Sequence, residues 1–187
     1  MNDFASLKSQ LLIAMPTLQD PNFSRTVTYM CEHGEHGAMG IVVNRPTELK
    51  LADVLRHMEI EGGLGEAGDQ IVYLGGPVEE ERGFVLHTHT DPWDSTLPVT
   101  AEISVTTSRD ILEAMARGEG PAHTLVALGY AGWGAGQLEN ELQENAWLSG
   151  PADNSILFNM PAEDRWEAAA RLLGVDVNLL SSEAGHA

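Results

Sequence analysis

The sequence predicts a single α+β domain that contains a mixed β-sheet. The chain has 187 residues, which corresponds to about one domain at roughly 150 residues per domain. Hydrophobic residues make up 43% of the chain and charged residues 20%, a composition typical of a globular protein with one core. Apolar runs of strand length alternate irregularly with segments of helical period. The strict βαβ order of a doubly wound fold is therefore absent, which favours the α+β class.

Strands are expected where short apolar runs lie between Gly, Pro and Asn residues. About eight such runs occur, over residues 11–15, 26–31, 39–43, 70–74, 83–87, 102–106, 124–129 and 155–158. A Gly-bearing segment, 31–39, joins the second run to the third, so we expect an antiparallel pair there.

About four segments are expected to be helical. Leu51, Val54, Leu55 and Met58 recur at i, i+3, i+4 and i+7, which places one apolar stripe on a helix. Residues 166–173 repeat this spacing, segment 107–118 begins with a Thr-x-x-Asp cap and ends at a glycine, and a further helix is expected over 137–145. The small, polar residues 181–187 are expected to form a disordered tail.

The acidic charge argues against two classes of partner. The chain has 28 acidic and 10 basic side chains, a net charge of −18, and only two of the basic residues are lysines. Proteins that bind nucleic acid neutralise phosphates with many Lys and Arg side chains, and anionic membranes attract polybasic segments. We therefore expect neither direct nucleic-acid binding nor docking on a membrane.

Cysteine content and hydropathy point to the cytoplasm. Cys31 is the only cysteine, so an internal disulfide is excluded. The sequence contains neither an apolar run long enough to span a bilayer nor the pattern of a signal peptide. We expect a cytoplasmic protein.

The densest polar cluster is Cys31-Glu32-His33-Gly34-Glu35-His36. On a regular strand Cys31 and His33 would share one face, and a histidine beside a thiol can produce a reactive thiolate. The opposing interpretation is a buried, inert thiol, because Cys31 ends an apolar run and the nearby glutamates would raise its pKa. We favour the buried thiol.

A zinc site is the second chemical alternative in this region. His33, His36 and Cys31 could be joined by His87 and His89, and nitrogen and sulfur ligands suit zinc. The sequence contains no Cys-x-x-Cys pair and no His-Glu-x-x-His helix. We therefore expect hydrogen-bonded or surface histidines and assign no metal and no cofactor.

Residues 129–136 are rich in glycine and are expected to form a loop between a strand and a helix. Such loops can cradle phosphates, but the Gly-x-Gly-x-x-Gly pattern is absent. The following segment carries Glu139, Glu141 and Glu144, which would repel a phosphate. We favour a structural role in which the glycines let the backbone turn tightly around Tyr130 and Trp133.

Three arginines, Arg25, Arg45 and Arg82, lie beside strand ends in an otherwise acidic chain. Two of them in one pocket could bind a carboxylate or a phosphate. The alternative, which we favour, is that they form structural salt bridges with the plentiful acidic residues.

The motifs collected along the chain together resemble the AlgH/YqgE family. They lie at 12–16, 20–23, 31–33, 37–40, 43–46, 75–78, 82–87, 106–108 and 129–138, and the resemblance runs from about residue 7 to about residue 174. The family pattern has Ser where Thr26 stands, a mild change.

The resemblance implies a bacterial cytoplasmic α+β protein with a mixed, strongly curved sheet flanked by helices. It supplies no reaction and no catalytic residues, although the family name comes from a link to alginate production and its members are labelled transcriptional regulators. The positions that match the family signature form the candidate functional surface: Cys31, Glu32, His33, Asn44, Arg45, Arg82, His87, Tyr130 and Trp133.

Three functions follow in order of preference. The first is a non-catalytic regulatory protein that acts through a protein partner, with any transcriptional effect indirect. The second is a module that binds a small anion or metabolite near Arg25 and Arg45. The third is a thiol enzyme or redox sensor that uses Cys31 and His33.

Overall fold

The computed structural model describes residues 6–62, 67–88 and 93–176. The strands are β1 (Gln10–Ala14), β2 (Val27–Gly34), β3 (Gly37–Val42), β4 (Pro46–Lys50), β5 (Ile71–Leu74), β6 (Val78–Thr88), β7 (Thr96–Pro98), β8 (Ile103–Thr106), β9 (Thr124–Gly134) and β10 (Trp147–Pro151). The helices are α1 (Leu51–His57), α2 (Arg109–Ala116), α3 (Gln137–Gln143), the π-helix η1 (Ser155–Asn159) and α4 (Ala162–Arg171). The expected α+β class is confirmed.

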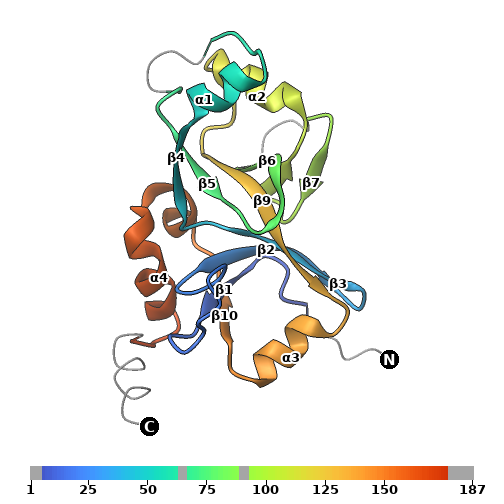
Figure 1. The fold of residues 1–187 in the computed structure, drawn as a ribbon, viewed down its shortest axis with the longest axis vertical. Coiled ribbons are helices and arrows are strands. Elements are labelled where there is room, and N and C mark those ends of the chain that lie inside the picture. The colour runs from blue at the N-terminus through green and yellow to red at the C-terminus, as the bar shows by residue number, and fades with distance from the viewer. Residues whose placement is uncertain (1–5, 63–66, 89–92, 177–187) are drawn as a thin grey trace.

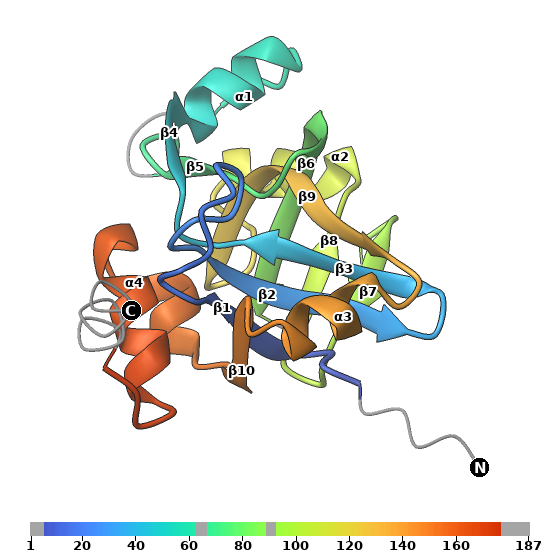
Figure 2. The same cartoon turned by 60° about the horizontal axis from the view of Figure 1, so that its bottom comes forward.

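The strands form one strongly curved, mixed sheet that resembles an open half-barrel (Figure 2). Its main order is β10-β1-β2-β3-β9-β6-β8-β7, and every pair along this path is antiparallel. β5 pairs parallel with β9 and antiparallel with β4, which makes the sheet mixed as expected. The predicted antiparallel pair is the β2–β3 hairpin.

β9 is the long strand on which both halves of the sheet depend. Its first half lies between β5 and β6, and its second half pairs with β3. At the change of partner, Gly129 has φ 78°, and a Cβ there would meet Gly76 O at 2.5 Å. The expected glycine-rich loop over 129–136 is therefore wrong for residues 129–134, because these glycines let two backbones approach closely inside a sheet.

The buried residues form three clusters that the helices cover (Figure 1). The first cluster lies between the concave sheet and α4 and contains Trp166. The second lies under α1 and α2, and the third lies under α3 around Trp133 and Trp147. Within the described ranges, no helix is long and apolar enough to cross a membrane.

Several expected elements differ from the structure. The run 155–158 is not a strand but part of η1, because the Asp153 carbonyl accepts hydrogen bonds from the N–H groups of Ile156 and Leu157 and closes a turn. The apolar pattern does not predict the strands β4, β7 and β10, since each is only three to five residues long and contains a proline. The expected tail, 181–187, lies outside the described residues.

Candidate functional groove

A broad, open groove of about 1070 Å³ crosses the mouth of the half-barrel. Its walls come from the N-terminal segment, the β2–β3 hairpin, β6, the β7–β8 region and β9. Five of the candidate residues line it, namely Glu32, His33, Arg82, Tyr130 and Trp133. Segments far apart in the sequence thus converge on one surface.

Bare glycine backbone forms part of the groove floor. Gly132 lies within β9 and is exposed, although the residues on either side of it are buried. A Cβ at Gly132 would meet the Tyr130 ring at 3.4 and 4.0 Å and Val78 Cγ2 at 3.9 Å, so it would touch side-chain carbons and no backbone atom. Gly34 and Gly37 of the hairpin also line the groove. Glycine inside a strand commonly marks a position where a ligand or another backbone approaches.

Aromatic side chains form one wall of the groove. The rings of Phe84 and Tyr130 meet edge to face with centroids 5.6 Å apart. The Arg82 guanidinium lies 5.5 Å from the Phe84 ring centroid and forms an ion pair with Glu79 at 3.4 Å. This wall combines apolar area with a cation and an anion that remain accessible.

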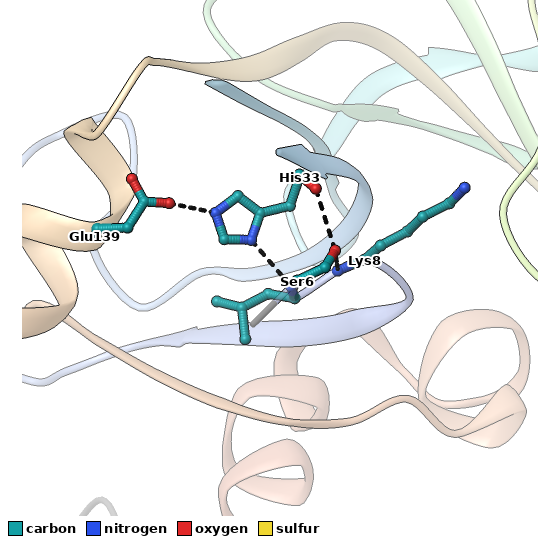
Figure 3. A network of polar contacts seen from close by, with 5 residues as sticks. Ser6, Lys8, His33 and Glu139 are labelled. Carbon is teal, nitrogen blue, oxygen red and sulfur yellow. Dashed lines mark hydrogen bonds and ion pairs between the residues drawn. The ribbon is translucent and has the colours of Figure 1, made fainter. Parts of the chain in front are cut away.

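His33 connects three parts of the chain at the edge of the groove (Figure 3). The Leu7 N–H donates a hydrogen bond of 2.9 Å to His33 Nδ1, and His33 Nε2 binds the Glu139 carboxylate on α3. The Ser6 hydroxyl also donates to the His33 carbonyl at 3.1 Å. Because Nδ1 accepts, the hydrogen of the neutral ring lies on Nε2 and is donated to Glu139. His33 therefore holds the N-terminal segment against the hairpin and α3.

Cys31 is buried and does not face the groove. Its side chain is 0% exposed, packs in the first core cluster, and its Sγ donates to the Tyr29 carbonyl at 3.7 Å. Burial, reinforced by the negative charge of Glu32, raises the thiol pKa well above its ordinary value, and Lys8 opposes this only in part. These contacts support the inert thiol over a reactive thiolate.

A β-bulge overturns the expectation that Cys31 and His33 share a face. Met30 pairs with Gly40 and Glu32 pairs with Met39, so Cys31 is the extra residue between two consecutive pairs. The bulge breaks the alternation of side chains along β2. The thiol packs in the core, and the imidazole binds Glu139 outside it.

Among the residues that the structure describes, the other histidines do not form a metal site with this cluster. His87 is buried, with Nε2 2.7 Å from the Thr106 hydroxyl and Nδ1 2.9 Å from the Thr88 carbonyl. His36 lines the groove, and His89 lies outside the described residues. No group of three or more potential metal ligands occurs in the described part of the chain.

Arg45 and Asn44 stabilise a loop away from the groove. Arg45 donates to the carbonyls of three loop residues, Pro21, Asn22 and Ser24, at 2.7, 2.7 and 3.0 Å. Burial lowers the Arg45 pKa, and Asp20 opposes the shift. Asn44 Oδ1 accepts from the Val27 N–H, and its Nδ2 donates to the Arg25 carbonyl.

Arg25 also has a structural contact. Its guanidinium carbon lies 4.3 Å from the centroid of the Trp166 ring, a cation–π geometry. The structure therefore does not bring Arg25 and Arg45 into one open anion pocket. Of the three arginines that the sequence singles out, only Arg82 forms the expected salt bridge within the described residues.

Sequence reasoning misses three residues that organise this region. Phe84 forms the aromatic wall, Glu141 accepts hydrogen bonds from the indoles of Trp133 and Trp147, and Arg165 is a buried cation. Glu141 lies on an expected helix, where a polar side chain is ordinarily assigned to solvent, and Arg165 lies one residue before another. The only sequence signal applies to Arg165: the chain has few basic residues, so each arginine is a candidate for a functional or structural role.

Comparison with known proteins agrees with this fold and with the motifs. The AlgH-like family profile matches residues 11–178. A UPF0301 protein of Thioalkalivibrio sulfidiphilus is 59% identical over 187 residues, which is all of both chains. The solution structure of the AlgH protein from Pseudomonas aeruginosa is 50% identical, covers all of both chains and has a TM-score of 0.80. A crystal structure of a Corynebacterium diphtheriae protein, only 19% identical, shares the fold with a TM-score of 0.74 over 97% of this chain and 94% of that one. The chain belongs to the AlgH-like family.

Proposed function

We propose that this protein is a non-catalytic binding protein that holds an extended segment of a partner protein in the groove. The observation that carries the proposal is the exposed Gly132 backbone on the groove floor. A side chain at this position would occupy the space that the partner's backbone needs. Any effect on transcription would then pass through the partner.

The chemistry of the walls suits a peptide. Tyr130, which is half-buried and packs edge to face on the buried Phe84 ring, offers aromatic contact area, a feature enriched at protein interfaces. The groove extends to β7, which ends the main strand order in the described structure, so an extended segment would lie beside a sheet edge. These features supply recognition without requiring a reacting group.

Charge favours a basic partner segment. The groove contains the carboxylates of Glu32, Glu79 and Asp94 against the cations of Lys8 and Arg82. The whole chain carries a net charge of −18, which attracts basic segments and repels nucleic acid. The same field speeds the encounter with a basic protein at low salt.

A plugging substitution tests the proposal. Gly132→Leu should fill the groove floor while preserving the fold, because the nearest atoms to the new Cβ are side-chain carbons at 3.4 and 3.9 Å. Gly83→Leu is the matched control, since Gly83 lies on β6, does not line the groove, and a Cβ added there would have no neighbouring atom within 4 Å.

Affinity capture from cell extract, followed by binding measurements on the purified partner, gives the readout. We expect a basic partner that binds the wild type and Gly83→Leu equally and binds Gly132→Leu at least about tenfold more weakly, as for the loss of an interface centre. Equal binding by Gly132→Leu would overturn the groove as the binding surface. Failure of every partner to bind the wild type would overturn the function.

A further inference from the structure

Arg165 on α4 holds a buried positive charge without a carboxylate partner. Arg165 is only 3% exposed, and no ion pair found among the described residues includes it. Nε donates to the Met160 carbonyl at 2.9 Å, Nη1 donates to the Val43 carbonyl, and the guanidinium carbon lies 5.1 Å from the Tyr73 ring centroid.

These contacts supply partial charges but no counter-charge. Burial lowers the Arg165 pKa, and Tyr73 opposes this shift through a charge interaction and a side-chain hydrogen bond. A guanidinium remains protonated in proteins at neutral pH. A buried charge is costly unless it is paired. The chain has 28 acidic residues that could have supplied a partner for this position, but none in the described ranges pairs with it.

A cavity of about 280 Å³ opens beside Arg165. One side is polar: Gln70 Nε2 donates to the carbonyl and the hydroxyl of Thr124, both at 2.9 Å. Another side is apolar and consists of Leu125, Leu157 and Phe158. The volume lies just below the range of about 300–1,000 Å³ for ordinary ligand pockets, so the cavity suits a small molecule.

We propose that this cavity binds a small organic monocarboxylate, with its carboxylate against Arg165 and its apolar part against the Phe158 side. A carboxylate supplies the missing negative charge and forms strong charge-assisted hydrogen bonds with a guanidinium. Asp69 also lines the cavity and is exposed. Its negative charge disfavours a second negative charge on the ligand, which selects a monoanion over a dianion. The site is separate from the groove, and neither proposal depends on the other.

Butyrate is the probe, and butyramide is its uncharged isostere. In titrations followed by ¹H–¹⁵N NMR, including the arginine Nε–Hε signals, we expect saturable shifts around the cavity with butyrate at millimolar concentrations. Butyramide should cause no saturable shift, and inorganic phosphate should bind more weakly than butyrate. Removing the charge in Arg165→Gln should weaken butyrate binding at least about tenfold, as for the loss of a charged hydrogen bond.

A rim substitution keeps the proposal testable if Arg165→Gln does not fold. Asp69→Asn removes the repelling charge and should strengthen butyrate binding about two- to fivefold. Glu102→Gln, an exposed carboxylate that does not line the cavity, is the matched control and should leave binding unchanged. The proposal is overturned if butyrate causes no saturable shift, if butyramide binds equally well, or if phosphate binds more tightly than butyrate. It is also overturned if Asp69→Asn and Glu102→Gln bind butyrate with the same affinity.

Discussion

The buried thiol of Cys31 makes a quantitative prediction about stability at alkaline pH. The ordinary thiol pKa is 9.0, and burial raises it in the folded protein. Above pH 9 the unfolded chain therefore releases the thiol proton while the folded chain keeps it. The stabilisation is complete below pH 9 and is lost as the pH rises toward the folded-state pKa.

The size of the effect follows from linkage. One unit above the unfolded pKa, at pH 10, deprotonation of the unfolded chain lowers the free energy of unfolding by about 1.4 kcal/mol for this one group. Tyr29, which packs in the same cluster and whose pKa is also raised by burial, adds its own loss from its ordinary pKa of 10.0 upward. Cys31→Ala removes the thiol contribution and leaves the burial of Tyr29, which is the larger cause of its raised pKa, while the smaller effect of Cys31 on Tyr29 is lost.

Urea unfolding at pH 8 and pH 10 provides the measurement. The free energy of unfolding should fall by about 1.4 kcal/mol more in the wild type than in Cys31→Ala. Comparing each protein with itself cancels the cost of the small cavity that alanine leaves. Equal falls in the two proteins would refute the buried thiol, as would alkylation of the folded wild type at the rate of a free cysteine.

Three further predictions concern the loop, α3 and nucleic acid. Arg45→Met should lower the free energy of unfolding by about 2 kcal/mol in urea titrations, because three loop carbonyls lose their donor and can be only partly rehydrated. An unchanged free energy of unfolding would show that these hydrogen bonds do not stabilise the fold. Glu141→Ala should cost about 2–4 kcal/mol in the same assay, since Trp133 and Trp147 are buried and lose their indole acceptor, whereas a near-neutral effect would mean that both indoles find other acceptors. Mobility-shift assays should show no DNA binding at physiological salt, and a sequence-preferring shift with a steep salt slope would contradict the charge argument.

Local periodicity predicts the elements of this fold better than it predicts which residues meet. The apolar spacing of residues 51–58 predicts α1, and the run 26–31 predicts most of β2. The bulge at Cys31 depends on how β2 pairs with β3, and no residue in β2 itself specifies it. A single unpaired residue is enough to separate Cys31 from His33, the pair on which the thiol hypothesis depends.

The glycine-rich segment 129–136 also shows that local sequence does not reveal which residues meet. In isolation, four glycines in eight residues are typical of a loop, because glycine weakens a strand. In the structure Gly129 lies against Gly76, and Gly75 lies against Gly129, so the glycines of one segment are explained by those of another. Both Tyr130 and Trp133 line the groove. They nevertheless pack in different clusters, Tyr130 against Phe84 in the first and the Trp133 indole under α3 in the third.

The surplus of acidic residues does not predict which arginines form salt bridges. Five of the eight bind a carboxylate no more than four residues away and are exposed: Arg56, Arg82, Arg109, Arg117 and Arg171. The remaining three, Arg25, Arg45 and Arg165, contact carbonyls or aromatic rings instead. A planar guanidinium with five donors can satisfy several carbonyls at once, and doing so avoids the desolvation of a second charge. Surplus carboxylates therefore neutralise the surface arginines and leave Arg165, the most buried of them, with a charge that a small external anion can pair.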